Sequence, residues 1–305
     1  MPSWRSTFIK VALASAAWLS AESAFAQACC AAASAVTPAR LTLHEKALVG
    51  VELRGQGVLG SYGPLGDYVP MPDGTVEVDS SASLLVGARV SRRIQIAGLL
   101  PWQETLRVTP GRGELGGGFG DLNLGLRYDV MFEHEHRRIP GVALLVGTTV
   151  PTGRAPELAK QPLATEATGI GAAQVHAAVA VEKQFGHWLV GATGLVARRL
   201  TRAAGSVETT LGTQLSALAN VSYLFPNLAA VALSASASEE GDATIDGEKR
   251  LDTGRSAFTT TLSGVLPLDS RMRLQGSLYM TPPVAGLGRN QNAVFALTMA
   301  ALASF

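Results

Sequence analysis

The chain has 305 residues, of which 47% are hydrophobic and 16% charged, and its formal net charge at pH 7 is +1. It has no basic stretch of the kind that neutralises a phosphate backbone, which excludes nucleic acid as an expected partner. Beyond the N-terminus, no window offers the roughly twenty uncharged apolar residues of a transmembrane helix.

The N-terminus has the features of a secretory signal peptide. Arg5 and Lys10 give it a positive start, an apolar stretch follows at 11–20, and small residues at 24–26 fit the cleavage rule. The apolar stretch is too short to span a bilayer, which argues against a membrane anchor. We therefore expect residues 1–26 to be removed, leaving a mature chain that is periplasmic, secreted or in the outer membrane.

Residues 27–46 are expected to form a periplasmic lead-in. They contain both cysteines of the chain, Cys29 and Cys30, whose adjacency rules out a framework of disulfides between distant segments. A vicinal disulfide, a metal contact and a simple tail all stay open for this pair.

From Leu41 onward, apolar and polar residues alternate in segments of about ten, the length that a tilted strand needs to cross a bilayer. The clearest segment is 121–132, in which Leu122, Leu124, Leu126, Tyr128, Val130 and Phe132 share one face and Asp121, Asn123, Gly125, Arg127 and Asp129 the other. This period of two indicates a strand and not a helix. The predicted strands are 47–58, 81–91, 93–108, 120–133, 139–152, 170–185, 188–202, 209–225, 228–238, 256–268, 272–281 and 293–305.

The links between these strands alternate strictly between long and short. The short links are 91–92, 134–138, 186–187, 226–227 and 269–271, and the long ones are 59–80, 109–119, 153–169, 203–208, 239–255 and 282–292. An even strand count with short periplasmic turns and long external loops is typical of an outer-membrane barrel. A sandwich or a propeller has no reason to sort its loops by length. The predicted fold is all-β: after a cleaved signal peptide, residues 47–305 form a transmembrane, antiparallel, up-and-down barrel of about 12 strands in the bacterial outer membrane.

The last predicted strand ends on an aromatic residue. Phe295, Leu297 and Met299 begin its apolar face, which runs on to the terminal Phe305, and Leu302 is the one exception to the alternation. A terminal aromatic resembles the assembly signal of outer-membrane barrels. We therefore predict that Phe305 is an assembly signal and that the partners are outer-membrane lipid and the barrel assembly machinery.

Several strings in the middle of the chain carry a family resemblance. They are Leu99-Leu-Pro-Trp102, the glycine-rich run at 116–128, the strand and Pro-Thr-Gly at 142–153, and Ala-Thr-Gly-Ile-Gly at 167–171. Together they resemble the outer-membrane family named for the MetA pathway of phenol degradation, and the resemblance covers most of the mature chain. It implies a transporter-like barrel channel for aromatic or other hydrophobic solutes. The glycines and prolines of these strings are expected to serve bends and turns.

If the apolar faces meet lipid, the polar faces point into the lumen, because ionisable side chains at membrane depth are costly elsewhere. The predicted lumen-lining residues are Glu52, Arg54, Arg89, Asn123, Arg127, Asp129, Gln174, His176, Glu182, Arg273 and Tyr279. They either line a polar path that sets charge preference or form ion pairs that fill a narrow barrel. Inward arginines outnumber inward acids, which predicts a slight preference for anions or neutral solutes in any conducting state.

Other chemistry has weaker signals. Glu133, His134, Glu135 and His136 have the side chains of metal ligands, but they fall in a predicted short turn without closed geometry, so no metal is expected. The glycine-rich run at 111–120 lacks the Lys-Ser/Thr ending of a phosphate loop and leads into a strand. His176 has no serine motif to accompany it, which argues against a barrel lipid hydrolase.

The function predicted from the sequence is passive passage of small, hydrophobic or aromatic solutes through an outer-membrane channel. No cofactor and no enzymatic activity are expected. The alternatives are a structural or adhesive barrel with a plugged lumen, and the lipid hydrolase. The sequence names neither the solute nor the oligomeric state.

Overall fold

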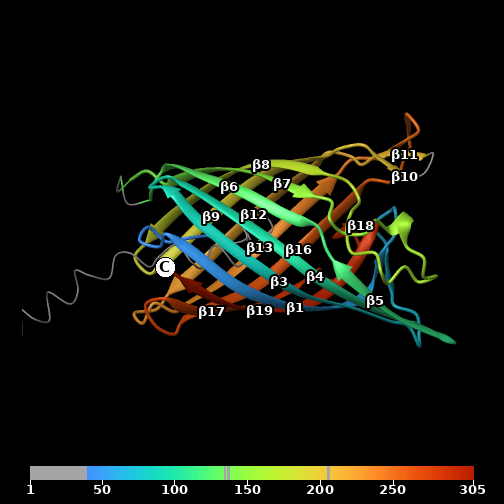
Figure 1. The fold of residues 1–305 in the computed structure, drawn as a ribbon, viewed down its shortest axis with the longest axis horizontal. Coiled ribbons are helices and arrows are strands. Elements are labelled where there is room, and N and C mark those ends of the chain that lie inside the picture. The colour runs from blue at the N-terminus through green and yellow to red at the C-terminus, as the bar shows by residue number, and fades with distance from the viewer. Residues whose placement is uncertain (1–39, 134, 136–137, 205–206) are drawn as a thin grey trace, which may run out of the picture.

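Twelve long antiparallel strands close into a barrel in the computed structural model, which describes residues 40–133, 135, 138–204 and 207–305 (Figure 1). The strands are β1 (Ala47–Tyr62), β3 (Val76–Ser91), β4 (Ile94–Thr109), β6 (Leu122–Met131), β7 (Gly141–Val150), β8 (Gln174–Phe185), β9 (Trp188–Arg199), β12 (Gln214–Leu224), β13 (Ala230–Glu240), β16 (Arg255–Pro267), β17 (Met272–Met280) and β19 (Gln291–Ser304). All twelve correspond to predicted strands, and the predicted fold class is confirmed.

The barrel closes where the first strand meets the last. β1 pairs with β19 from Leu48 opposite Ser304 to Tyr62 opposite Gln291. The backbone of Phe305 continues the seam, because its carbonyl accepts the amides of Lys46 and Ala47 at 2.6 and 3.1 Å. Each strand of the ring therefore has two partners, which satisfies the backbone where lipid offers no hydrogen bonds.

The short elements all belong to the long links, which gather at one end of the barrel (Figure 1). They are β2 (Tyr68–Pro70), β5 (Arg112–Phe119), the 3-10 turn η1 (Pro156–Leu158), β10 (Arg202–Ala204), β11 (Val207–Thr210), β14 (Thr244–Ile245), β15 (Glu248–Lys249) and β18 (Gly288–Arg289). β10, β11, β14 and β15 pair in that order into a small separate sheet that joins two loops. The long–short alternation of the links thus has a structural counterpart, with the turn end and the loop end at opposite ends of the barrel.

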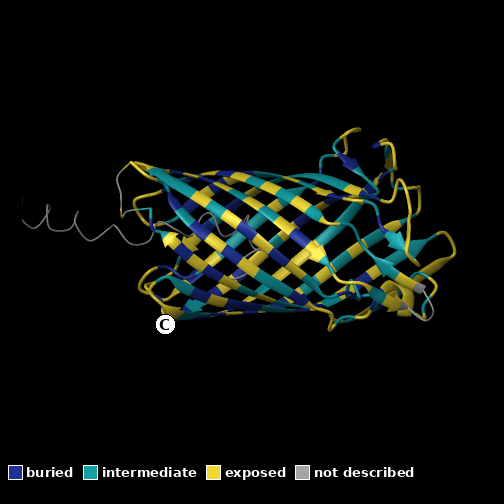
Figure 2. Ribbon diagram, turned by 90° about the horizontal axis from the view of Figure 1, so that it is seen from above, coloured by how far each residue is buried: buried dark blue, intermediate teal, exposed yellow. Residues whose placement is uncertain are grey.

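Burial alternates along the strands, as the chequered pattern of the barrel wall shows (Figure 2). In β6, Leu124 is 43% exposed on the outer face, whereas Arg127 on the inner face is 5% exposed. In β8, Val179 is exposed and His176 is buried. A barrel that presents large apolar side chains outward fits a lipid solvent. Among the described residues, no helix has the length and hydropathy of a transmembrane span.

One residue departs from its predicted face. Phe132, predicted on the outer face with Leu124, is buried, because the register shifts at Val130 and the strand ends at Met131. Its ring lies 5.4 Å from the guanidinium of Arg93 instead. Leu302, the exception in the last strand, faces inward and is buried. The predicted signal peptide 1–26, the pair Cys29 and Cys30, and lead-in residues 27–39 lie outside the described residues.

Candidate functional site

The barrel interior holds the predicted lumen residues, but it does not bring them into one site. Arg89, Arg127, Asp129, Glu182 and Arg273 lie toward the turn end, where they meet residues 40–46. Glu52, Arg54 and Tyr279 lie on the wall formed by β1, β19 and β17, and Asn123, Gln174 and His176 lie toward the loop end of β6 and β8.

Residues 40–46, which we call the N-terminal segment, lie inside the turn end of the barrel. Leu41 is 2% exposed and packs in one cluster with inward-facing Leu48, Leu85 and Leu302. This contact explains the apolar exception at Leu302, since the side chain covers a part of the chain and not lipid. The described part of the predicted periplasmic lead-in is therefore packed against the inner wall.

Arg89 on β3 holds the backbone of the N-terminal segment. Its guanidinium donates hydrogen bonds to the carbonyl oxygens of Leu41 at 3.0 Å, Thr42 at 2.7 Å and Glu45 at 3.2 Å. The amide of Leu41 in turn donates to Oε1 of Gln95 on β4 at 3.0 Å. A charged donor that bonds three carbonyls is a strong anchor, because bonds to ionised groups are stronger than neutral ones.

Ion pairs complete the attachment of the N-terminal segment. Arg40 donates to Oε2 of Glu182 at 2.7 Å, and Arg273 pairs with Glu45. Arg127 pairs with Asp129 at 2.8 Å, and its Nη2 lies 3.9 Å from Glu182. These pairs neutralise much of the positive charge that the sequence assigned to an open lumen. Breaking one would leave a buried charge without its partner, which is costly.

Arg54 and Tyr279 form a second polar group on the adjoining wall. The guanidinium of Arg54 lies 5.0 Å from the ring centroid of Tyr279 and hydrogen-bonds to its hydroxyl and to Gln56. Gln56 then donates to Asp79 at 3.4 Å. Arg54 is exposed although it points inward, so the interior at this level is open to solvent among the described residues. Glu52 precedes Arg54 on the same inner face.

The loop-end residues form smaller contacts. The amide oxygen of Asn123 accepts the hydroxyl of Thr149 at 2.7 Å, and that of Gln174 accepts Nε of Arg199 at 3.1 Å. His176 lies over Gly147, where a Cβ would stand 2.3 Å from its Nε2. The buried Nε2 of His176 has no hydrogen-bond partner among the described residues, so no nucleophile is paired with it there.

A band made mostly of hydroxyl side chains lies on the inner faces of β12, β13, β16 and β17, and the sequence interpretation missed it. Register places these residues side by side on inner-facing positions, while neighbours such as Leu233 and Leu262 are exposed outside. We call this band the hydroxyl belt, and it consists of the hydroxyl side chains of Ser216, Ser222, Ser234, Ser236, Ser238, Thr259, Thr261, Ser263 and Ser277 together with the amide of Asn220. Leu218, Ala232 and Ala257 share inner-facing positions with them. Charged residues occur on these inner faces only beyond the belt, such as Glu240 at the loop end and Arg273 at the turn end.

Three strings of the family resemblance meet in space at the loop end. Asp121 accepts the amides of Gly153 at 2.9 Å and Ile170 at 2.7 Å, so it ties together both ends of the link between β7 and β8. The hydroxyl of Thr152 donates to the carbonyl of Gly120 at 2.7 Å. These motif residues therefore fix a loop.

The glycine-rich run has a related role. The link between β7 and β8 crosses the inner side of β5, where a Cβ on Gly116 would stand 2.6 Å from Oγ1 of Thr165. The amide of Leu163 donates to Oε2 of Glu114 at 2.8 Å on the same side. Glycine is required at position 116 because the loop backbone passes too close for any larger residue.

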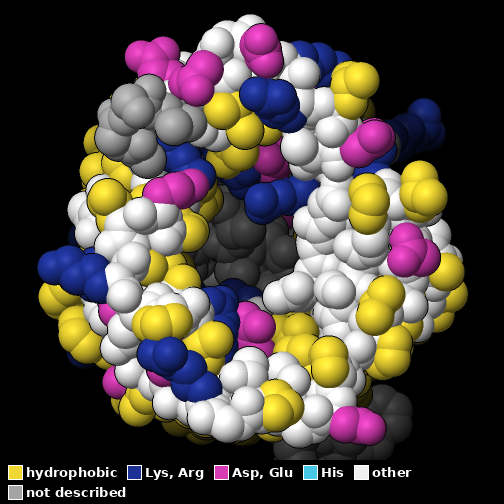
Figure 3. All heavy atoms as spheres, turned by 90° about the vertical axis from the view of Figure 1, so that its right-hand side faces the viewer, with side chains coloured by type: hydrophobic (Ala, Val, Ile, Leu, Met, Phe, Trp, Pro, Cys, Tyr) yellow, Lys and Arg dark blue, Asp and Glu magenta, His cyan; other side chains and the backbone are white. Residues whose placement is uncertain are grey.

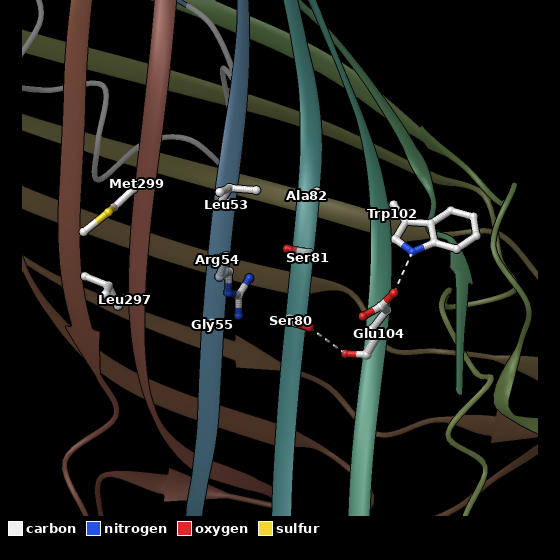
Figure 4. A pocket seen from close by; sticks show the side chains of 10 residues that line it. All are labelled: Leu53, Arg54, Gly55, Ser80, Ser81, Ala82, Trp102, Glu104, Leu297 and Met299. Carbon is white, nitrogen blue, oxygen red and sulfur yellow. Dashed lines mark hydrogen bonds between the residues drawn. The ribbon is translucent and has the colours of Figure 1, made fainter. Parts of the chain in front are cut away.

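A hollow of about 400 Å³ lies on the outer wall across β19, β1, β3 and β4. Figure 4 shows Trp102 and Glu104 of β4 on one side and Leu297 and Met299 of β19 on the other. Residues of β1 and β3 lie between them, namely Leu53, Arg54, Gly55, Ser80, Ser81 and Ala82. Nε1 of Trp102 donates to Oε1 of Glu104 at 3.3 Å. Since Leu53 and Trp102 are exposed on the outer face, this hollow suits a lipid chain and lies apart from the interior.

Seen from the loop end, the described residues surround an opening, and acidic and basic side chains lie around it (Figure 3). Within the described part of the chain, no three His, Cys, Asp or Glu side chains are grouped so as to hold a metal ion. Two of the four metal-ligand candidates, His134 and His136, lie outside the described residues. Glu133 pairs with Lys183 at 3.2 Å and Glu135 with Arg93 at 2.8 Å.

Several solved structures are similar to this fold. The COG4313 outer membrane channel from Pseudomonas putida is similar with a TM-score of 0.70 and 17% identity, over 86% of this chain and 97% of that one. The translocator domain of the autotransporter NalP from Neisseria meningitidis matches at 0.47 and 9% identity, over 90% and 92% of the two chains. The NanC porin matches at 0.48 and 8%, over 84% and 99%. The last two likenesses are too low to carry an argument.

The closed twelve-stranded sheet, its apolar outer face and the likeness to a solved channel define the class of this protein: a β-barrel of the bacterial outer membrane. No family model matches the sequence. No curated protein matches it either. The outer-membrane part of the family resemblance is thus supported at the level of the fold, whereas the link to phenol degradation stays a prediction.

Proposed function

We propose that this protein is a passive channel for small solutes, whose turn end is narrowed by the N-terminal segment. The observation that carries the proposal is Arg54, an inward-pointing cation that remains exposed within the barrel. A barrel filled by its own side chains would bury such a residue or pair it with an acid. An open, polar interior is what a water-filled passage requires.

The runner-up is a structural barrel with a plugged lumen, and a specific observation favours it. The N-terminal segment is anchored by Arg89, Gln95, Glu182 and Arg273, which come from four different strands. If these contacts never release, the turn end stays obstructed. The channel proposal requires either that space remains beside the segment or that the segment leaves the lumen.

Conductance of the purified barrel in planar bilayers tests the proposal. Discrete current steps are expected from the channel, and a heat-dependent shift in gel mobility should show that the same sample is folded. A folded sample without current would favour the plugged barrel. Lipid hydrolysis by this sample would instead support the hydrolase, for which the partnerless Nε2 of His176 gives little support.

The solute class is the finer part of the proposal. The family resemblance implies hydrophobic or aromatic solutes, but the described interior offers them few surfaces. Leu48, Leu85 and Leu302 are covered by Leu41, and the ring of Tyr279 is covered by Arg54. A second apolar cluster, formed by Leu189, Leu224, Ala230 and Ala232, is buried at the turn end. Farther toward the loop end, the inner faces of β12, β13, β16 and β17 carry mostly hydroxyl groups, which makes neutral polar solutes the better-supported cargo.

A further inference from the structure

The hydroxyl belt provides a recognition surface without net charge along the lumen. In one row, Asn220 stands opposite Ser234, Ser234 opposite Thr261, and Thr261 opposite Tyr279. Residues directly opposite in an antiparallel sheet have Cβ atoms about 5 Å apart. The belt therefore repeats hydroxyl groups across the strands at a spacing that one small molecule can bridge.

The belt hydroxyls have bonding capacity left over. Oγ of Ser263 is buried and has no hydrogen-bond partner among the described residues, and the same holds for Ser222. Ser234 reaches only the carbonyl of Thr261, at 3.5 Å. Ser222, Ser234 and Ser263 are themselves buried. The hydroxyls of Ser236, Thr259 and Thr261 are only half-buried, so this part of the belt is accessible from the lumen.

The chemistry of a hydroxyl determines what it recognises. Each hydroxyl both donates and accepts, and this suits solutes whose own groups do both. An ion would be held better by full charges, and an aromatic hydrocarbon would leave the hydroxyls without partners. Arg54 and Tyr279 border the belt and add further donors.

We propose that the hydroxyl belt is the selective wall of the channel and that it favours small, neutral, polyhydroxylated solutes. This inference rests on the proposed passive channel and specifies its cargo. It predicts that a polyol passes through the channel faster than a molecule of similar size whose oxygens are mostly ethers. Ether oxygens accept hydrogen bonds from the belt but cannot donate them.

Osmotic swelling of liposomes that contain the full-length mature barrel tests this inference, with xylitol and triethylene glycol as a pair of nearly equal mass. The rates are corrected with protein-free liposomes. We expect xylitol to be favoured by about fivefold, the equivalent of one net hydrogen bond. The combined variant Ser236→Ala, Thr259→Val and Thr261→Val removes hydroxyls that are accessible in the lumen, and it should lose this preference but still form conducting channels.

Thr260→Val is the matched control. Thr260 is adjacent to Thr261 on β16 but lies on the outer face, so the same change there should leave the preference intact. Gel mobility of unheated samples confirms that each variant is folded. If the wild type and the triple variant prefer xylitol equally, or if the wild type shows no preference, the inference is overturned but the proposed channel is not. Absence of both current and swelling would refute the channel, and the inference with it.

Discussion

Replacement of Arg89 by methionine is expected to loosen the N-terminal segment. Methionine keeps an unbranched apolar stem but has no donors. The guanidinium it replaces holds the carbonyls of Leu41, Thr42 and Glu45 at 3.0, 2.7 and 3.2 Å. We count about 1 kcal/mol net for each bond, since the released carbonyls regain water, which gives about 3 kcal/mol in total.

That free energy corresponds to roughly a 150-fold rise in the ratio of released to seated segment. Two measurements report it. Single-channel recordings should show longer occupancy of the higher-conductance state. In a background of Cys29→Ser and Cys30→Ser, a thiol reagent should modify the Leu41→Cys site faster once Arg89 is replaced, because this position is 2% exposed in the seated segment.

Two variants make the result specific. Arg89→Lys keeps the charge but has a single ammonium group in place of the guanidinium fork, so its effect should be intermediate. Arg198→Met removes an exposed arginine of β9 and should change neither measurement. If Arg89→Met leaves both the dwell times and the labelling rate as they are in the parent, Arg89 does not hold the segment and the argument is refuted.

Three further predictions concern the wall, the seam and the lumen. Leu124→Arg, on the outer face, should lower the free energy of unfolding by about 2–4 kcal/mol, and Asn123→Arg, at the adjacent inward position, should lower it by less. If denaturant titrations give the reverse order, the assignment of these two residues to the outer and inner faces is wrong. Deletion of Phe305 should reduce the yield of folded barrel in the outer membrane far more than deletion of Gly247 in a loop, and equal yields would exclude an assembly signal. Arg54→Gln should shift the reversal potential in a salt gradient toward cation preference, because this arginine is exposed in the lumen, and an unchanged potential would show that selectivity arises elsewhere.

The barrel could be predicted from the sequence because the signals for it lie within single strands and links. Each strand reveals its two faces through a period of two, and the alternation of long and short links distinguishes the loop end of the barrel from the turn end. The prediction of strands and faces failed where the alternation within a strand is interrupted or the strand is too short to show it. At Val130 one extra residue shifts the register, so Phe132 is buried instead of facing lipid. The small sheet in the loops consists of strands of two to four residues, too short to show a period.

The interior was less accessible to sequence reasoning. Alternation indicates that Arg273 and Glu182 point inward, but not that they meet Glu45 and Arg40, because those contacts depend on how the closed wall surrounds the N-terminal segment. The apolar Leu302 was the available signal that something packs there. The hydroxyl belt was missed because serine and threonine look like neutral filling in one strand, and only register across four strands aligns them.

The position of the N-terminal segment has a consequence for the order of biogenesis. Although the N-terminal segment is synthesised before every strand of the barrel, its partners are synthesised much later, at sequence separations of 142 residues for Arg40 with Glu182 and 228 for Glu45 with Arg273. Contacts between such distant residues form late, because the intervening chain must be organised before they gain anything. The N-terminal segment is thus among the last parts to dock, after the final hairpin that carries Arg273 has joined the wall.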